Sequence, residues 1–316
     1  MDRNLALEFV RVTEAAAIAA AGWIGRGDAK AADQAAVDEM RDRFKYVPFQ
    51  GVVVIGEGAK DEAPELYVGE KLGDGTGPEL DIAVDPLECT DSVANGRPNA
   101  MAVIATGKKG SLFHAPDTYM NKIACGPQAR GVIDLDASVE ENIGRVAEKL
   151  EKSISDMVLI ALDRPYNQEI IEEVRRLGAR IRLIPDGDVA GAIATCLPDS
   201  GIDLLIQKGA SAEGVLAAVA IKALGGDFQG RLAPKNDEHL ARVKAMGITD
   251  VNKKLLLEDL AAGDDLTFTA TGVIDGPLLK GVRYTSNYCL THSVVIRAKS
   301  GTVRFLETQH RLKNNF

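Results

Sequence analysis

Short apolar strings alternate with helix-forming segments after residue 150, and this alternation constrains the fold more than any other feature of the sequence. The expected strands are residues 157–162, 180–184 and 202–206, and the expected helices are residues 168–177, 189–195 and 215–224. Alternating strands and helices with short links are typical of right-handed βαβ units. The sequence therefore predicts a parallel sheet in this part of the chain.

The remaining segments predict a second layer of helices and strands. The expected elements are helices at residues 5–22 and 31–44, and strands at residues 51–55, 80–84, 101–106, 267–273, 293–298 and 303–306. We predict an α/β protein of two domains, with a mixed sheet in residues 1–150 and βαβ units in residues 151–316.

Charge and composition exclude several classes of function. The chain has 37 Lys and Arg residues against 46 Asp and Glu residues and no dense basic cluster, which argues against nucleic acid as a partner. The apolar strings are too short to span a membrane, and the first residues lack the pattern of a signal peptide. We therefore expect a cytoplasmic protein with no membrane partner. The four cysteines and four histidines show no spacing typical of a disulfide framework or a zinc site, so carboxylates are expected to carry the chemistry.

Acidic residues gather where predicted strands end. Asp85 and Glu88 follow one strand, which we expect Pro86 to terminate. Glu57 and Asp61 follow another strand between glycines. Open α/β sheets bind their ligands at the C-terminal ends of their strands. Each acidic group taken by itself is explained equally well by a solvated turn.

Acidic residues recur in the second half of the chain. Asp186 and Asp188 follow a predicted strand, and Glu213 precedes a predicted helix. By itself, Asp188 is most simply an N-cap, and Glu213 is a charge favoured at a helix start. Clustered carboxylates repel one another unless cations lie between them, so the repetition indicates bound Mg²⁺ or Mn²⁺. Carboxylate sites for these ions are suited to phosphate chemistry.

A series of short motifs runs along nearly the whole chain. These motifs are Gly25-Arg-Gly-Asp28, Ala31-Ala-Asp33-Gln-Ala-Ala-Val37, Val54-Ile-Gly-Glu57-Gly58, Asp61-Glu-Ala-Pro64, Ala83-Val-Asp85-Pro86-Leu87-Glu88, Ala115-Pro-Asp117, Tyr119-Met120, Asp186-Gly-Asp188-Val189-Ala190, Ala270-Thr-Gly272 and Thr291-His292-Ser293. With them the chain resembles the class II fructose-1,6-bisphosphatases, a bacterial-type branch of the lithium-sensitive sugar and inositol phosphatase superfamily. The resemblance implies a two-domain layered α/β sandwich of the sugar phosphatase type.

The resemblance also implies an activity and a role for individual residues. The implied reaction is metal-dependent hydrolysis of the 1-phosphate of fructose 1,6-bisphosphate, carried out by a homo-oligomer (a dimer or a tetramer). Asp61 and Thr90 match the pair that orients the attacking water. The positions that match metal ligands are Asp33, Glu57, Asp85, Glu88 and Glu213. The positions that match substrate contacts are Glu88, Cys89, Thr90, Tyr119, Arg164, Pro165, Tyr166, Asp186, Gly187, Asp188 and Ala210. The N-terminal domain would then bind the metal, and the C-terminal domain would complete the substrate site.

Several positions near the implied site depart from the family pattern. They are Cys89 in place of a glycine, Tyr166 in place of an arginine, Asn167 where histidine is common, Lys208 at a normally apolar position, and Ala210 in the normally glycine-rich stretch that follows it. A side chain at position 89 is expected to be strained, and to lower activity, if the backbone there has a positive φ. The alternatives that remain are hydrolysis of sedoheptulose 1,7-bisphosphate or another sugar phosphate, and a weakly active or non-catalytic protein that binds metal and sugar phosphate. A nicotinamide dehydrogenase is disfavoured because no GxGxxG motif follows the strand at 157–162.

Overall fold

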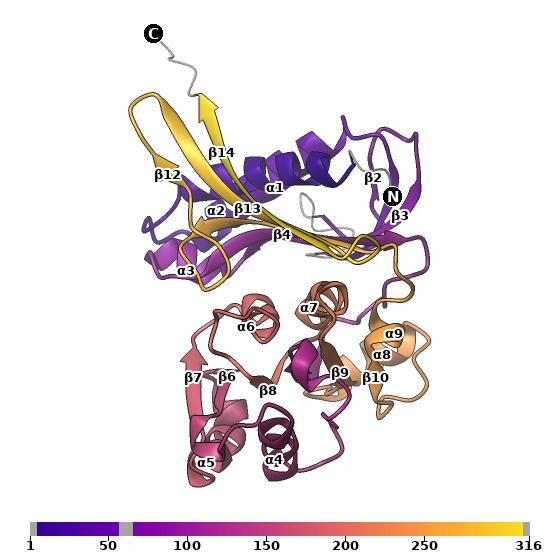
Figure 1. Ribbon diagram of the computed structural model, residues 1–316. Helices are drawn as coiled ribbons and strands as arrows, with labels where there is room; N and C mark the ends of the chain where they lie inside the picture. Colours follow the sequence, from indigo (N-terminus) through magenta and orange to yellow (C-terminus); the bar gives the residue numbers. More distant parts are fainter. Residues whose placement is uncertain (1–4, 57–65, 312–316) are drawn as a thin grey trace. The chain divides into compact units, whose positions relative to one another are not determined.

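The computed structural model of the chain describes residues 5–56 and 66–311 (Figure 1). It contains two compact units, Met1–Leu112 with Asp264–Phe316, and Phe113–Gly263. The domain boundary expected near residue 150 lies inside the second unit. The division differs from that expectation because the strand that begins at Thr267 pairs with the strand at Ala100–Lys108, which brings the C-terminal segment into the first unit. Both units contain a mixed sheet, so the chain is a mixed α/β protein.

Two helices cover one face of the sheet in the first unit. They are α1 (Leu5–Ala21) and α2 (Ala29–Phe44), and both confirm the predicted helices. Asp28 caps α2 by accepting the N–H of Ala31 at 3.0 Å. Phe9 of α1 meets Phe44 and Phe49 edge to face, with ring centres 6.2 and 5.3 Å away, and these rings form the centre of the core.

Eight strands of the described residues form the sheet of the first unit. They are β1 (Gln50–Ile55), β2 (Lys71–Leu72), β3 (Glu79–Glu88), β4 (Ala100–Lys108), β11 (Thr267–Ile274), β12 (Arg283–Tyr284), β13 (Tyr288–Arg297) and β14 (Thr302–Arg311). The order is β12-β13-β11-β4-β3-β1-β2, with β14 paired to β13. The β1–β3 pair is parallel and the other pairs are antiparallel. The strands predicted from the sequence in this unit are confirmed.

Strand β3 does not stop at Pro86, contrary to the prediction. Asp85 pairs with Val103 and Glu88 with Met101, so the register with β4 shifts by one residue between them. A bulge of this kind accommodates a proline, because the missing N–H falls at the interruption of the ladder. The strand therefore extends to Glu88, and the short helix α3 (Thr90–Asn95) begins two residues later.

The second unit has a six-stranded sheet within the described residues. Its strands are β5 (Tyr119–Cys125), β6 (Val158–Leu162), β7 (Arg180–Ile184), β8 (Leu204–Ala210), β9 (Asp227–Leu232) and β10 (Leu255–Leu256), in the order β10-β9-β5-β8-β6-β7. Strand β6 is parallel to β7 and β8, which confirms the predicted βαβ units. Strands β5 and β9 were not predicted, and they make the sheet mixed because β5 runs antiparallel to β8 and β9.

Helices lie on both faces of this second sheet (Figure 1). They are α4 (Val139–Lys149), α5 (Gln168–Arg176), α6 (Asp188–Ala194) and α7 (Ser211–Leu224), followed by α8 (Asp237–Ala245) and α9 (Leu257–Leu260). Ile143 of α4 and Val174 of α5 belong to one core cluster with Leu159 and Leu204 of the sheet. Helices α6 and α7 pack against each other on the other face, and nearly all of their residues after the first turn are buried.

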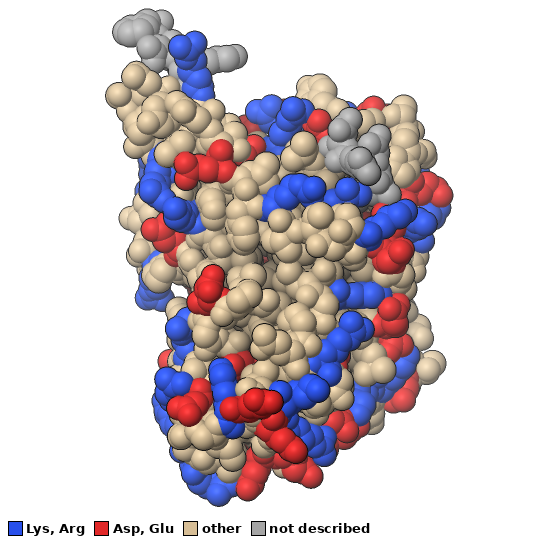
Figure 2. All heavy atoms as spheres, in the orientation of Figure 1, with Lys and Arg blue, Asp and Glu red and all other residues tan. Residues whose placement is uncertain are grey.

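Among residues 5–56 and 66–311, no helix is long and apolar enough to cross a membrane. Figure 2 shows Lys and Arg side chains interspersed with Asp and Glu over the face in view.

Candidate active site

Three of the predicted metal ligands, Asp33, Asp85 and Glu88, lie near the start of α2 and toward the end of β3. Asp85 accepts the N–H of Leu87 at 3.1 Å, and Glu88 is 4% exposed. Asp33 lies in the second turn of α2. The turn before α2 is fixed against α3, because the N–H groups of Gly25 and Gly27 donate to carbonyl groups of that helix at 2.9 Å. This unit therefore ties the start of α2 to the segment that follows Glu88.

The residue between Glu88 and α3 has an unusual backbone. Cys89 has φ 71° and ψ 50°, in the left-handed region that favours glycine. Its side chain is buried in the core cluster of the first unit. Thr90 follows as the first residue of α3 and is half-buried. The positive φ makes Cys89 a strained position, as the sequence analysis anticipated for this case.

The predicted metal ligands are only partly within the described residues. Glu57 and the catalytic candidate Asp61 lie outside them. In the part of the chain that the structure describes, no three His, Cys, Asp or Glu side chains are grouped so as to hold a metal ion. Glu213 belongs to the second unit. The ligand set named from the resemblance therefore stays a prediction.

The predicted substrate residues of the second unit lie along one edge of its sheet, the edge formed by the C-terminal ends of β6, β7 and β8. Arg164 follows β6, Asp186 follows β7, and Ala210 ends β8. Tyr119 begins β5, which runs antiparallel to β8, so Tyr119 pairs directly with Ala210. Sequence reasoning placed Arg164 and Asp186 after strands, whereas the predicted strand at 202–206 stops short of Ala210 and the position of Tyr119 depends on a strand that was not predicted.

Strands β6 and β8 separate at this same edge. Their ladder includes Leu159–Leu204 and Ile160–Leu205, and side-chain amides bridge the strands beyond it. Asn167 donates to the carbonyl of Leu162 at 3.2 Å and accepts the N–H of Lys208 at 2.7 Å. Gln207 accepts the N–H of Leu162 at 2.7 Å. A divergence between neighbouring strands is where open α/β sheets accommodate ligands.

Aromatic rings gather beside Tyr119. Its ring centre is 5.2 Å from that of Tyr166 and 6.3 Å from that of His239, which is stacked at 12°. Thr118 holds the imidazole in place through a 3.0 Å hydrogen bond to Nδ1. Burial raises the pKa of Tyr166, with a further contribution from Tyr119. Pro165 and Tyr166 are exposed, so one side of this aromatic group is open to solvent.

Two buried charges meet behind this edge. Lys122 of β5 is 2% exposed and Asp188 is 6% exposed, and their Nζ and Oδ2 atoms are 2.5 Å apart. Lys122 also donates to the carbonyl of Ala210 at 2.7 Å, and Gln207 donates to Asp188 at 3.1 Å. Asp188 is the first residue of α6 and Gly187 is its N-cap, so the interpretation of Asp188 as a cap is wrong. Its carboxylate turns to the lysine instead.

Glu213 lies in the first turn of α7 and has a perturbed carboxyl group. Burial and the nearby Asp188 carboxylate raise the pKa of Glu213 to about 7, while Lys122 acts in the opposite direction. Its Oε2 atom is buried and has no hydrogen-bond partner among the described residues. A buried carboxylate oxygen with remaining acceptor capacity fits a cation ligand.

Sequence reasoning missed Lys122 and Gln207 and named Asn167 only as a departure from the family pattern, although all three hold this edge together. A weak signal was present, because Lys122 directly precedes the apolar residues Ile123, Ala124 and Cys125. A lysine beside such a run is almost never buried unless it is paired. The identity of its partner could not be read from the local sequence.

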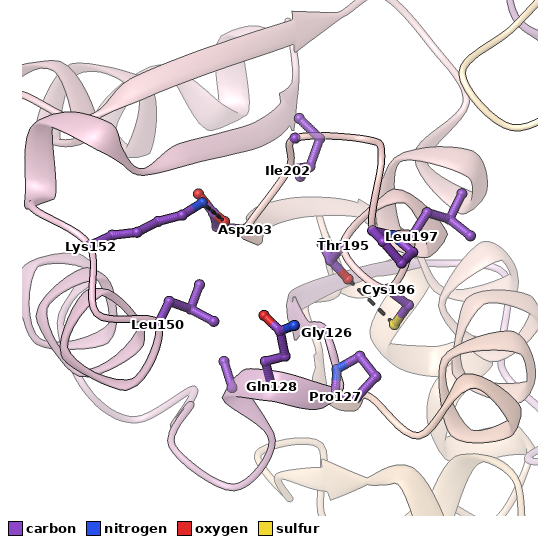
Figure 3. Close-up of a pocket in the computed structure, with 13 residues that line it drawn as sticks. Gly126, Pro127, Gln128, Leu150, Lys152, Thr195, Cys196, Leu197, Ile202 and Asp203 are labelled. Carbon is purple, nitrogen blue, oxygen red and sulfur yellow. Dashed lines mark hydrogen bonds and ion pairs between the residues drawn. The ribbon is translucent and has the colours of Figure 1, made fainter.

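A separate hollow of about 310 Å³ lies near the opposite end of β8 (Figure 3). Its lining includes Gln128, Leu150 and Cys196, together with Lys152 and Asp203. Lys152 and Asp203 form an ion pair of 2.5 Å along one side. None of the predicted site residues lines this hollow.

Comparisons with known proteins cover nearly the whole chain. Residues 3–310 match the family described as "Bacterial fructose-1,6-bisphosphatase, glpX-encoded". The chain is 47% identical to "Fructose-1,6-bisphosphatase class 2" of Haemophilus influenzae over 325 residues, which cover 99% of this chain and 97% of that protein. It is 46% identical to "Fructose-1,6-bisphosphatase 1 class 2" of Escherichia coli K12, over 99% of this chain and 96% of that protein.

One solved structure has only a slight likeness to the chain. "Extragenic suppressor from Pyrococcus furiosus" shares 17% identity, with a TM-score of 0.30 over 61% of this chain and 68% of that chain. A likeness this low carries no argument about fold or function.

Proposed function

The chain belongs to the family of bacterial, glpX-encoded fructose-1,6-bisphosphatases, and we propose that it hydrolyses fructose 1,6-bisphosphate to fructose 6-phosphate and phosphate. The observation that carries the proposal is the 46–47% identity to class 2 fructose-1,6-bisphosphatases over 99% of the chain. The chain is thus a phosphatase of carbohydrate metabolism. The two-domain layout of the lithium-sensitive sugar phosphatases is also part of the proposal, supported by two units that each contain a mixed sheet with helices.

We also propose that Mg²⁺ or Mn²⁺ is the cofactor. The residues that would hold it are Asp33, Glu57, Asp85, Glu88 and Glu213. The buried Oε2 of Glu213 supports this assignment, because the described part of the chain offers it no hydrogen-bond donor. A divalent cation bound to carboxylates polarises the phosphoryl group and offsets the charge that develops in the transition state.

Thr90 and Asp61 are proposed to act on the attacking water. The Thr90 hydroxyl would accept a hydrogen bond from the water and donate one to the Asp61 carboxylate. The water oxygen would then bond to phosphorus as the bond to the sugar O1 breaks. Thr90 would take the water proton and pass its own proton to Asp61, while O1 leaves with the electron pair of the broken bond and takes up a proton from solvent. The position of Thr90 at the first residue of α3, directly after the rigid turn at Cys89, supports a fixed hydroxyl.

The edge of the second sheet is proposed to hold the sugar and its other phosphate. Arg164 provides a cationic group suited to bidentate phosphate binding. Asp186 and Asp188 are acceptors for sugar hydroxyls, and the ring of Tyr119 gives an apolar face. The convergence of these residues at one edge supports their role as substrate contacts.

Sedoheptulose 1,7-bisphosphate is the second candidate substrate. Tyr166 stands where the family pattern has an arginine, and its ring lies against Tyr119 at the same edge. A phosphate contact replaced by an aromatic surface would favour a different sugar length. The expectations of a cytoplasmic location and of a homo-oligomer stay predictions.

Phosphate release from a panel of sugar phosphates tests the proposal. The purified chain is assayed with added Mn²⁺ or Mg²⁺ on fructose 1,6-bisphosphate, sedoheptulose 1,7-bisphosphate and fructose 6-phosphate. We expect the highest kcat/KM with fructose 1,6-bisphosphate. A higher value with the seven-carbon bisphosphate would reverse the substrate assignment, and no release from any of them would leave the non-catalytic alternative.

A further inference from the structure

Lys122 is a buried cation to which neither the sequence motifs nor the proposed reaction gives a role. It lies in β5, between β8 and β9, and only 2% of it is exposed. Burying an ammonium group is costly unless the group is paired. Even when paired, a buried ion pair often stabilises a protein no more than apolar residues of the same volume would. Stability alone therefore gives no reason for a lysine at this position.

The ammonium of Lys122 connects two elements that carry predicted substrate contacts. Nζ is 2.5 Å from Asp188 Oδ2, at the start of α6, and 2.7 Å from the carbonyl oxygen of Ala210, at the end of β8. Gln207 donates to the same Asp188 oxygen at 3.1 Å and accepts the N–H of Leu162 at the end of β6. One lysine and one glutamine thus join the ends of β6 and β8 to the start of α6.

The space for this side chain depends on a glycine. A Cβ atom on Gly209 would lie 2.2 Å from Asp188 Oδ2 and 3.0 Å from Lys122 Nζ. Such a contact with the carboxylate is far too close, so the ion pair and a side chain at position 209 exclude each other. The Lys122–Asp188 ion pair therefore requires glycine at position 209.

Two carboxylates and the starts of two helices determine the electrostatic environment of Lys122. The first turns of α6 and α7 carry partial positive charge, which disfavours a nearby cation. Asp188 and Glu213 lie in these two turns and offset it. Lys122 in turn reduces the repulsion between the two carboxylates, since it is the source of favourable charge that acts on Glu213. The lysine thus allows two negative groups to remain close together at the edge of the sheet.

We propose that Lys122 is a positioning residue, which fixes the Asp188 carboxylate and the Ala210 carbonyl in the orientation that binds the sugar bisphosphate. This inference rests on the proposed function, because it assigns a role within that site. Its consequence is a loss of substrate binding when the ammonium is removed, beyond any loss of stability.

Steady-state kinetics of Lys122→Met and a matched control test the inference. Lys222 is the control, because its ammonium also contacts one carboxylate, that of Glu258 at 2.6 Å, and one carbonyl, that of Ala261 at 2.6 Å. Both variants lose the same kinds of contact, but Lys222 touches none of the predicted substrate residues. Thermal unfolding is measured alongside to report the effect on stability.

For Lys122→Met we expect KM for fructose 1,6-bisphosphate to rise at least ~10-fold and kcat/KM to fall about 10²-fold, as for a displacement of about 1 Å in a binding group. For Lys222→Met we expect kcat/KM within about 3-fold of the wild type, a range set by the modest effect of distant contacts. Similar losses in both variants, or an unchanged KM in Lys122→Met, would overturn the inference. Absence of wild-type turnover would instead contradict the proposed function.

A second pair of variants applies if Lys122→Met does not fold, because removing one partner leaves a buried charge unpaired. Asp188→Asn is compared with the double variant Lys122→Met/Asp188→Asn, which has neither charge. The double variant also frees the Ala210 carbonyl, so a positioning role predicts that any further loss relative to Asp188→Asn appears in KM for fructose 1,6-bisphosphate, with kcat within about 3-fold. A kcat of the double variant that is 10-fold or more below that of Asp188→Asn, with KM unchanged, would show a role other than positioning and refute the inference.

Discussion

Replacing Cys89 separates two opposing contributions to the stability of the turn between β3 and α3. The backbone at Cys89 is left-handed, with φ 71°, which penalises any residue with a Cβ atom. The side chain is only 7% exposed and packs in the core cluster of the first unit. Cys89→Ala removes the sulfur and keeps the Cβ atom, whereas Cys89→Gly removes both.

The magnitudes follow from these two features. Loss of the buried sulfur should destabilise Cys89→Ala by about 1 kcal/mol, the usual effect of deleting one buried heavy atom. Removing the Cβ atom relieves about 1–2 kcal/mol of left-handed strain, offset by about 0.4–1 kcal/mol from the greater freedom of an unfolded glycine. Cys89→Gly should therefore be about 0.5–1 kcal/mol more stable than Cys89→Ala, and close to the wild type.

Glu151 offers a control in which a substitution by glycine changes the backbone strain but not the packing of a buried side chain. It has φ 55° and an exposed side chain, at the position after the C-cap of α4. The N–H groups of Glu151 and Lys152 donate to Glu148 and Ala147, which is the bonding of a Schellman motif that usually has glycine at this point. Glu151→Gly should stabilise the protein by about 0.5–1 kcal/mol, because it relieves strain without loss of packing.

Thermal and urea unfolding of the four proteins measure these differences. One kcal/mol corresponds to about 2–4 °C in Tm for a domain of 150–250 residues. The expected order of Tm is Glu151→Gly above wild type, Cys89→Gly near wild type, and Cys89→Ala lowest. A Tm for Cys89→Gly at or below that of Cys89→Ala, together with a stabilised Glu151→Gly, would refute strain at Cys89.

The Cys89→Gly variant also tests whether the strain affects catalysis. Relief of about 1 kcal/mol would favour the conformation that places Thr90, and would raise kcat/KM by about 5-fold at most. The kcat/KM values of the wild type and Cys89→Gly are measured under reducing conditions with excess Mn²⁺, because oxidation of the Cys89 thiol would itself alter the activity of the wild type. Equal kcat/KM values would show that the site accommodates the sulfur without cost to turnover, and a drop would show that Cys89 assists a different substrate.

Three further predictions concern the reaction and its pH dependence. Thr90→Ala should lower kcat by about 10²-fold or more with KM little changed, as for a group in proton transfer, and a change confined to KM would mean that Thr90 only binds substrate. Asp85→Asn should abolish activity while circular dichroism stays unchanged, chelation of the wild type should do the same, and wild-type turnover in Asp85→Asn would exclude the proposed ligand. Burial and the positive charge of Lys280 lower the pKa of His292 from 6.5, and its Nδ1 accepts the N–H of Lys280 at 3.2 Å. The unfolded state therefore binds a proton more readily, so the unfolding free energy of the first unit should fall as pH decreases below about 6.5. His292→Gln should reduce that fall, and an identical pH profile in urea unfolding would contradict the assignment.

Patterns with a short period were sufficient for much of the secondary structure. Helices α1 and α2 follow from apolar residues at helical spacing, and β1 and β6 follow from short apolar runs. The same reading placed Arg164 and Asp186 shortly after strands, where the structure also has them, whereas Asp85 lies within β3 because that strand continues to Glu88. The strain at Cys89 was foreseeable from the resemblance once a positive φ was assumed.

The sequence by itself thus determined the local elements and the chemical character of the strand ends, since both depend on neighbours within about one turn or one strand. Only the tertiary structure decided that β5 and β9 join the second sheet, because their polar residues obscure the apolar pattern until partners cover them. It also decided that the C-terminal strands belong to the first unit, through pairing of β11 with β4. Lys122 is the clearest case, because its partners lie 66 and 88 residues away in the sequence. A buried charge is acceptable only where the fold brings an opposite charge and a carbonyl to it, and no local pattern specifies which distant residues those are.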